Sequence, residues 1–316
     1  MLIIGLVLLV GGSSLLVDGA SDIARRSGIS EFVIGITIVG IGTSTPEMVV
    51  SFLGALRGSA DLAVGNIIGS NIFNTLLILG VTAMILPMEI SRHAFRRDIP
   101  INIAVACLLV ILGLDHTIFG GAANVLGRLD GAILLLLFAA YILMSLKEGR
   151  EEGQDNGNEA DVPTSKCVWI PLLMVIGGLA GLVTGGRLFV DNAVDIARAM
   201  GWSEKFIAIT ILAGGTSMPE LVTCVVAAFK KKDQLALGNI LGSNISNVLL
   251  ILGGSALIHP LSMENITMTD LGFFLLSAIV LFIANFVLGK RLLSRIEGFV
   301  LLALEAAYMY LLITAL

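Results

Sequence analysis

The sequence contains little charge, and this scarcity excludes most classes of soluble protein. Only 14% of the 316 residues are charged, whereas 56% are hydrophobic and the mean hydropathy is +0.97. Soluble domains carry about twice this charged fraction. No part of the chain is basic enough to indicate a nucleic-acid partner. The composition therefore predicts a membrane protein.

Cysteine and histidine are equally scarce, with three residues of each. Cys107, Cys167 and Cys224 lie in or beside apolar runs without the spacing of a metal site, so we interpret them as packed thiols. The sequence contains neither an HExxH motif nor a pair of aspartates on adjacent apolar runs, and either of these would have indicated a membrane enzyme. We expect a protein that is not an enzyme and uses no cofactor.

Apolar runs of about 18 residues or more recur along the chain, which is the length of a transmembrane helix. The first run begins at Met1 without a preceding basic residue, so we interpret it as a retained span rather than a signal peptide. The predicted fold class is an all-α polytopic membrane protein with ten transmembrane helices. Their approximate limits are residues 1–20, 31–56, 63–86, 99–115, 128–146, 167–190, 203–229, 235–259, 270–289 and 297–315.

A polar stretch at residues 147–166 separates the first five spans from the last five. It is acidic and rich in Gly and Asn, as solvated linkers are. We therefore divide the chain into a five-helix repeat at 1–146, a linker at 147–166 and a second five-helix repeat at 167–316. Most Lys and Arg residues lie in the linker and in the other loops of the same face. The positive-inside rule then places the linker in the cytoplasm and both termini outside.

The two halves align without a gap when the chain is shifted by 173 residues. The segment VDGASDIARRSGISEF corresponds to VDNAVDIARAMGWSEK, and LAVGNIIGSNIFNTLLILG corresponds to LALGNILGSNISNVLLILG. Shared Asp, Asn, Glu, Pro and Thr residues exclude a common apolar bias as the cause. Because each half holds an odd number of spans, the second half must enter the membrane in the opposite sense. Inverted repeats of this kind are typical of secondary transporters.

Each half contains a proline inside an apolar span, Pro46 in GTSTPE and Pro219 in GTSMPE. Proline lacks an N–H and clashes with the carbonyl four residues earlier, which belongs here to Gly42 or Gly215. An unpaired carbonyl in hydrocarbon needs a partner or a cavity. A cation is one such partner, and a simple kink satisfied by neighbouring helices is the alternative.

A glutamate follows each proline directly, at Glu47 and Glu220. A carboxylate in the middle of a span costs several kcal/mol and usually marks an ion path. Helical spacing of four residues brings a threonine onto the same face as each glutamate, and it pairs serine with asparagine in the second repeated motif, GNxxGSN. These candidates are Thr43, Thr216, Ser70, Ser243, Asn74 and Asn247.

Together these side chains offer only oxygen ligands, which suit hard cations such as Ca²⁺ and Na⁺ rather than zinc or copper. Two ionised glutamates carry a charge of −2, which one Ca²⁺ or two Na⁺ would neutralise. Ions that share one carboxylate pair must compete for it, and this competition is the physical basis of exchange. The same pair can also take protons, so proton coupling remains an alternative.

Other interpretations apply to some of these features. The motif glycines can serve close helix packing alone. A channel is a further alternative, although broken helices in inverted halves suit occlusion of the ion better. Asp18 and Asp191 repeat near the ends of the first and sixth spans, and we favour a structural role for them. Glu305 in the last span has no counterpart in the first half.

The paired GTSxPE and GNxxGSN segments resemble the alpha repeats of the cation/calcium exchanger superfamily, in its sodium/calcium exchanger branch. The resemblance implies two five-helix halves around four oxygen-rich sites. It implies that Glu47 and Glu220 hold Ca²⁺ and contribute to Na⁺ sites, while the other candidates complete them. It adds the backbone carbonyls of Gly40 and Ala213 as ligands. It also implies that the first and sixth spans slide across the remaining bundle.

Some members of this superfamily have Asp where this chain has Asn74 or Asn247. Two asparagines argue against potassium co-transport and leave the middle site neutral. The short linker is typical of a prokaryotic member without a large regulatory loop. We therefore expect a functional monomer that contacts membrane lipid, spans the plasma membrane (the cell inner membrane) and exchanges Na⁺ for Ca²⁺.

Overall fold

The computed structural model describes all residues except 59, 121–122, 156–168, 202–212, 289–290 and 315–316. The described chain is predominantly helical, and several helices contain a π-helical turn, labelled η. The first half contains α1 (Leu2–Ser27), α2 (Glu31–Ile34), η1 (Gly35–Val39), α3 (Gly40–Thr43), α4 (Thr45–Leu56), α5 (Ala60–Phe73), η2 (Asn74–Ile78), α6 (Leu79–Ile85), η3 (Ala94–Asp98), α7 (Ile99–Gly113), α8 (Asp115–Phe119) and α9 (Arg128–Asp155). The second half contains α10 (Trp169–Ala199), α12 (Ala213–Gly215), α13 (Met218–Phe229), α14 (Asp233–Ser246), η5 (Asn247–Leu252), α15 (Gly253–Ile258), α16 (Met268–Leu288) and α17 (Arg295–Thr314).

Within the described residues, six helices are long and apolar enough to cross a membrane, or seven if the bent pair 31–43 and 45–56 is one span. Large apolar side chains such as Ile3, Val7 and Leu173 are exposed, as lipid-facing residues are. The chain is therefore a polytopic membrane protein of the all-α class.

Three helices extend beyond the limits that the sequence indicated. Helix α1 continues to Ser27 rather than ending near residue 20, α9 continues to Asp155 rather than ending at residue 146, and α10 continues to Ala199 rather than ending at residue 190. The start of the linker at 147–166 is therefore helical. The end of that linker, and the beginning of the span predicted at 203–229, lie outside the described residues.

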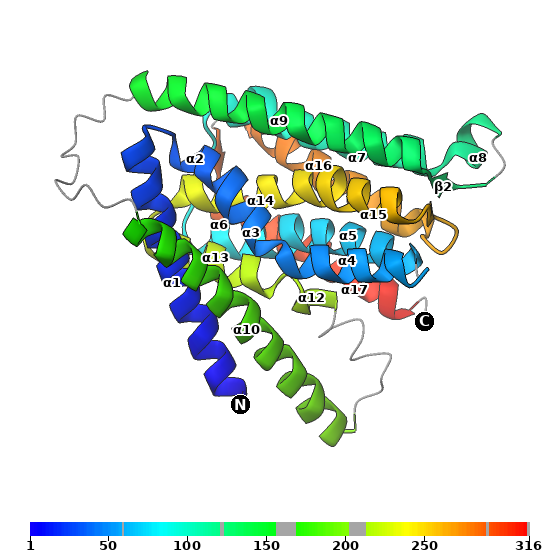
Figure 1. The fold of residues 1–316 in the computed structure, drawn as a ribbon, viewed down its shortest axis with the longest axis horizontal. Helices are drawn as coiled ribbons and strands as arrows, with labels where there is room; N and C mark the ends of the chain where they lie inside the picture. The colour runs from blue at the N-terminus through cyan, green and yellow to red at the C-terminus, as the bar shows by residue number, and fades with distance from the viewer. Residues whose placement is uncertain (59, 121–122, 156–168, 202–212, 289–290, 315–316) are drawn as a thin grey trace.

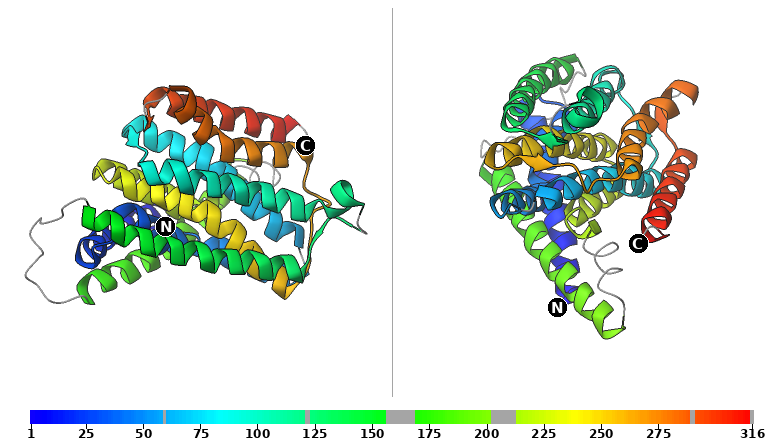
Figure 2. Two further views of the ribbon diagram at one scale, coloured as in Figure 1. Left: turned by 90° about the horizontal axis from the view of Figure 1, so that it is seen from above. Right: turned by 90° about the vertical axis from the view of Figure 1, so that its right-hand side faces the viewer.

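Helices α1 and α10 lie side by side and extend away from the remaining bundle (Figures 1 and 2). Glycines allow their backbones to approach closely. A Cβ on Gly12 would lie 2.8 Å from the Gly178 carbonyl oxygen, and a Cβ on Gly178 would lie 2.7 Å from that of Gly12. Close packing between small residues is a common basis of helix association in membranes. The two helices therefore form one tightly packed pair.

The centre of the bundle is occupied by α14, in which every residue from Leu235 to Ser246 is buried. Two short antiparallel ladders link the halves at the edges of the bundle. Strand β1 (Met88–Glu89) pairs with β4 (Leu292–Leu293), and β3 (Leu261–Ser262) pairs with β2 (Val125–Leu126). Because β1 and β3 are related by the 173-residue shift, each half contributes the same strand to a ladder with the other.

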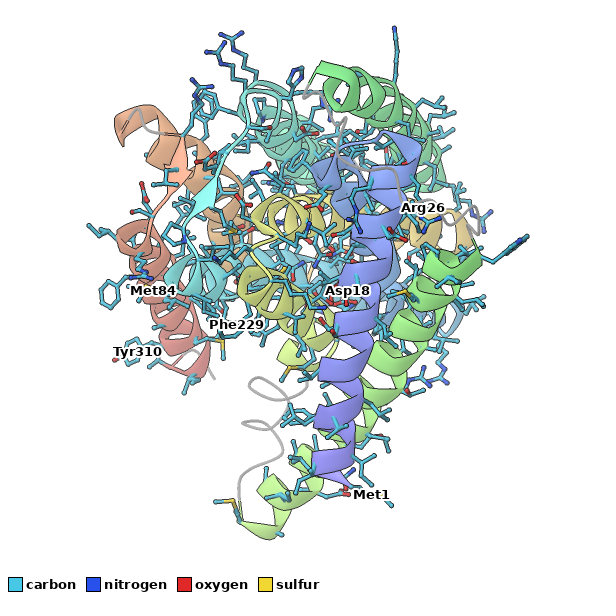
Figure 3. The ribbon with its side chains drawn as sticks, turned by 90° about the vertical axis from the view of Figure 1, so that its left-hand side faces the viewer. Met1, Asp18, Arg26, Met84, Phe229 and Tyr310 are labelled. Carbon is cyan, nitrogen blue, oxygen red and sulfur yellow. The ribbon has the colours of Figure 1, made fainter. Side chains whose placement is uncertain are left out.

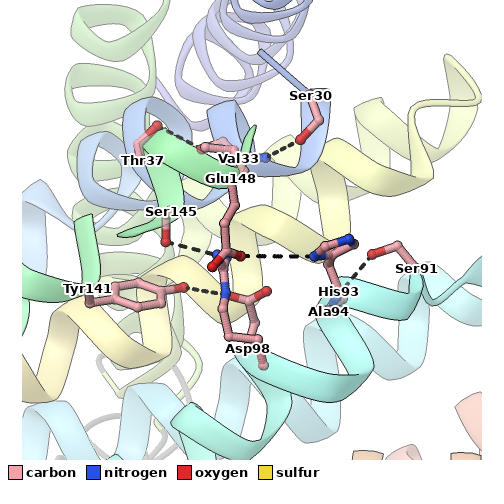
Figure 4. Close-up of polar contacts among 11 residues, drawn as sticks. Ser30, Val33, Thr37, Ser91, His93, Ala94, Asp98, Tyr141, Ser145 and Glu148 are labelled. Atoms are coloured by element: carbon pink, nitrogen blue, oxygen red, sulfur yellow. Dashed lines mark hydrogen bonds and ion pairs between the residues drawn. The ribbon is translucent and has the colours of Figure 1, made fainter. Parts of the chain in front are cut away.

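A polar cluster connects η3 to the far end of α9 (Figure 4). The Arg97 guanidinium donates to Asp98 Oδ1 at 2.7 Å and also contacts the Glu148 carboxylate. The Tyr141 hydroxyl donates to the same Asp98 oxygen at 3.2 Å. Asp98 is fully buried, so these donors stabilise a charge that would otherwise be costly to bury. The cluster holds the polar extension of α9 against the bundle.

Candidate ion-binding site

Each repeated hexapeptide forms a break between two helical segments. In the first half, α3 ends at Thr43, Ser44 has non-helical dihedral angles, and α4 begins at Thr45 with a bend of 48°. In the second half, a turn at Thr216 and Ser217 separates α12 from α13. The proline lies in the first turn of the following helix in both cases, where its missing N–H is not needed. The breaks therefore arise where the sequence predicted them.

The two glutamates lie in the interior and approach each other from opposite halves. The exposed fraction is 1% for Glu47 and 0% for Glu220. The Ser217 hydroxyl donates to Glu47 Oε1 at 3.0 Å, and the Ser44 hydroxyl donates to Glu220 Oε1 at 3.0 Å. Each half thus orients the carboxylate of the other half.

Ser44 and Ser217 were absent from our candidate residues, although both stand inside the hexapeptides. Helical spacing did not indicate them, because the partner of each serine is in the other half of the chain. Their occurrence at equivalent positions of both hexapeptides was the signal that could have identified them.

The threonines of the two breaks contact asparagines of the second motif. Thr43 donates to Asn239 Oδ1 at 3.0 Å, and Thr216 donates to Asn66 Oδ1 at 3.4 Å. These two bonds are equivalent under the 173-residue shift. The bonds therefore fix the broken helices against α14 and α5 in the same way in both halves.

A second pair of equivalent bonds joins α5 and η2 to α14 and η5. Asn74 Nδ2 donates to Asn244 Oδ1 at 3.1 Å, and Asn247 Nδ2 donates to Asn71 Oδ1 at 2.8 Å. The amide nitrogens of Asn74 and Asn247, the two predicted ligands, are therefore both engaged in hydrogen bonds. The amide oxygens of Asn74 and Asn247 are left available to another partner.

Five of the predicted side chains have a buried oxygen without a hydrogen-bond partner among the described residues. They are Glu47 Oε2, Ser70 Oγ, Asn74 Oδ1, Glu220 Oε2 and Asn247 Oδ1. A buried oxygen without a partner costs about 1–3 kcal/mol, and more if it is charged. A hard cation that accepts carboxylate, amide and hydroxyl oxygens as ligands would remove this cost.

The backbone carbonyls behave differently from our expectation at one position. Thr45 Oγ1 donates to the Gly42 carbonyl at 2.6 Å, so this carbonyl already has a partner and the prediction that proline leaves it open was wrong. The Gly40 carbonyl accepts a bond of 3.1 Å from Ser243 Oγ at the junction of the halves. Ala213, the equivalent of Gly40, is the first residue of α12.

The described residues contain no group of three or more His, Cys, Asp or Glu side chains that could hold a metal ion. A cation at this position would therefore depend on two carboxylates and several neutral oxygens. A cleft of about 170 Å³ leads to the break in the second half. It is lined by Pro46 and Val50 of α4, by Arg187 and Asp191 of α10, and by Thr216. The cleft thus reaches Thr216, one of the candidate residues.

The sequence matches the sodium/calcium exchanger protein family over residues 1–147 and 170–314, which is almost the whole chain. The chain belongs to this family. It is thus a cation/calcium antiporter of the prokaryotic type and not an enzyme.

Individual relatives within the family agree with this assignment. The sodium/calcium exchanger MaX1 of Methanosarcina acetivorans is 32% identical, covering 98% of this chain and 97% of its own. The inner membrane protein YrbG of Escherichia coli is 37% identical, and the match covers 82% of this chain and 79% of YrbG. A more distant relative, 23% identical over 73% of this chain, is named a Ca²⁺/H⁺ antiporter and comes from Aphanothece halophytica.

A solved structure of the sodium-calcium exchanger NCX_Mj, soaked with Na⁺ and Ca²⁺, superposes on this chain with a TM-score of 0.82. The two chains are 31% identical, and the superposition covers 99% of this chain and 96% of the other. The similarity supports the polytopic helical fold of this family member.

The crossed serine–glutamate bonds give a testable prediction for this family member. Ser217→Ala removes the donor to Glu47, and a bond to a charged group contributes about 1.5–3 kcal/mol, so we expect the apparent Ca²⁺ affinity to fall by about tenfold or more. Calcium titration of uptake would measure this change. Ser277→Ala, which removes a buried hydroxyl that bonds to its own helix at Phe274, should leave the affinity unchanged. Equal effects of both variants would contradict a specific role for Ser217.

Proposed function

We propose that the chain exchanges Na⁺ for Ca²⁺ at a site formed by Glu47 and Glu220. The observation that supports this proposal most strongly is a group of buried oxygens from both halves. These oxygens have no hydrogen-bond partner among the described residues. The two ionised glutamates carry a net charge of −2, which one Ca²⁺ or two Na⁺ neutralise. Occupation by one ion species therefore excludes the other, as an antiporter requires.

The remaining ligands in this proposal come from the same four segments. Thr43, Thr216 and the Gly40 and Ala213 carbonyls are proposed to supply further oxygens. Ser70 and Ser243 complete the outer Na⁺ sites, and Asn74 and Asn247 flank the middle. The equivalent bonds of Thr43 and Thr216, and of Asn74 and Asn247, support a site with internal two-fold symmetry.

Access to this site is proposed to alternate within ten spans arranged as two inverted five-helix repeats. The equivalent hydrogen bonds and the two equivalent strand ladders support the inverted arrangement. The close packing of α1 against α10 favours their movement as one unit across the other helices. In this arrangement the linker is cytoplasmic and both termini lie outside the cell inner membrane. We propose that one chain in lipid is sufficient for transport.

A calcium/proton antiporter is the second candidate, because the same two carboxylates can carry protons instead of sodium. This candidate is supported by the relative from Aphanothece halophytica, which is named a Ca²⁺/H⁺ antiporter. We prefer sodium because the neutral oxygens of Ser70, Asn74 and Asn247 are suited to a bound metal cation, whereas a proton needs only the carboxylates.

Transport by purified protein in liposomes distinguishes the two candidates. Proteoliposomes loaded with Na⁺ and diluted into Na⁺-free medium should accumulate radioactive Ca²⁺, and liposomes with equal Na⁺ on both sides should not. Protein-free liposomes are the control for leakage. Uptake that ignores the Na⁺ gradient and follows an imposed pH gradient would replace the sodium assignment by the proton one.

A further inference from the structure

Lys230 connects the end of α13 to the middle of α1. Its Nζ lies 2.7 Å from Asp18 Oδ1, donates to Ser14 Oγ at 2.7 Å and donates to the Ser14 carbonyl at 3.2 Å. Asp18 lies on the part of α1 that passes the bundle (Figure 3). One residue thus ties α1 to the helix that carries Glu220, on the side where the predicted cytoplasmic loops lie.

The 173-residue shift gives each member of this contact a counterpart on the opposite side. Asp191 corresponds to Asp18, and Arg57 corresponds to Lys230. Asp191 lines the open cleft, and Arg57 follows the last residue of α4. Within the described residues, neither Arg57 nor Asp191 takes part in an ion pair, so the counterpart contact is not formed in this conformation.

We infer that the Asp18–Lys230 pair and the Asp191–Arg57 pair are alternating latches, one for each face of the membrane. This inference rests on the alternating access proposed above. The glycine contacts between α1 and α10 make these helices move together, so a shift that separates Asp18 from Lys230 carries Asp191 toward Arg57. Either latch can close only when the other is open.

The two latches differ at a third position, which biases the conformation. Ser14 supplies two oxygen acceptors to Lys230, whereas its counterpart is Arg187, which also lines the cleft. A second cation beside Asp191 competes with Arg57 and repels it. The closed Asp18–Lys230 latch is thereby favoured, together with the open cleft on the opposite side.

Labelling of a cleft residue tests the latches without measuring transport. Val50→Cys places a thiol on the α4 wall of the cleft, and its reaction with a membrane-impermeant maleimide is measured by mass spectrometry of the labelled peptide, which separates it from the native cysteines. In this background Asp18→Asn and Lys230→Met should each lower the equilibrium constant for the open cleft by about fivefold, the equivalent of roughly 1 kcal/mol for a partly exposed ion pair, and labelling should slow as the open population falls. Arg187→Ser should slow labelling in the same direction.

Two further variants make the result decisive. Exchange of the charges by Asp18→Lys with Lys230→Asp should restore the labelling rate, whereas Asp22→Asn, which removes a partner of Arg25 and Arg26 on the same helix, should not alter it. An unchanged rate in both single variants, or a double variant that remains slow, would overturn the inference. Because labelling needs no ion gradient, failure of Na⁺-driven Ca²⁺ uptake would leave this test intact.

Discussion

Glu220→Gln is expected to abolish Na⁺-driven Ca²⁺ uptake, and Glu47→Gln is expected to do the same. Both side chains are buried, and each replacement halves the negative charge available to the cation. Two unit charges about 4 Å apart interact with roughly 4 kcal/mol at an effective dielectric constant of 20, which is nearly a thousandfold in affinity. Glutamine keeps the size and one oxygen of the side chain, so the loss of charge is the main change.

Glu305→Gln is the matched control for these variants. Glu305 is also buried in a helix, with an exposed fraction of 4%, and one of its oxygens has no partner among the described residues. It lies on α17 and has no counterpart in the other half. Uptake by this variant should stay close to that of the unmodified protein. A loss in Glu305→Gln equal to that in Glu220→Gln would show that any buried carboxylate is needed, and the assignment of the site would fail.

Gly242→Ala is expected to disrupt the site by separating two helices rather than by changing a ligand. A Cβ on Gly242 would meet the Ile36 carbonyl oxygen well inside van der Waals contact, and the three nearest atoms all belong to the Ile36 backbone, which no rotamer change can move. Overpacking of this kind costs about 1–3 kcal/mol and occasionally more. The adjacent Ser243 bonds to the Gly40 carbonyl, so separation of α14 from η1 also breaks a contact of the candidate site.

Thermal unfolding in detergent and Ca²⁺ uptake would measure the two consequences of Gly242→Ala. We expect a lower unfolding temperature together with strongly reduced uptake. Gly11→Ala is the control, since a Cβ on Gly11 has no described atom within 4 Å and this residue is exposed on α1. A variant at Gly242 that unfolds and transports like the Gly11 variant would contradict the close approach of α14 to η1.

The sequence indicated which residues belong to the candidate site, but not the contacts among them. Glu47 and Glu220 were identifiable because a carboxylate in an apolar span is costly and because each follows a proline in a repeated motif. The crossed bonds of Ser44 and Ser217 depend on how the two halves meet, which no spacing within one half reveals. Thr45 likewise satisfies the Gly42 carbonyl through its own rotamer, which the motif did not specify.

The ends of the helices were less predictable than their apolar centres. Hydropathy falls at Lys147, so the sequence indicated the end of a span there, yet α9 continues to Asp155. Polar residues remain helical outside the apolar region when tertiary contacts hold them, as the contact of Glu148 with Arg97 does. The charge pattern marks where the apolar segment ends and not where the helix ends.

The most direct test of a shared calcium site is the structure of the purified protein in crystals soaked with Ca²⁺. Joint binding by the two glutamates predicts a single ion with Glu47 Oε2 and Glu220 Oε2 both at about 2.3–2.6 Å, the usual distance between calcium and oxygen. The same density should disappear when Na⁺ replaces Ca²⁺ at high concentration. An ion that binds away from these carboxylates, or that contacts only one of them, would contradict the proposed mechanism of exchange.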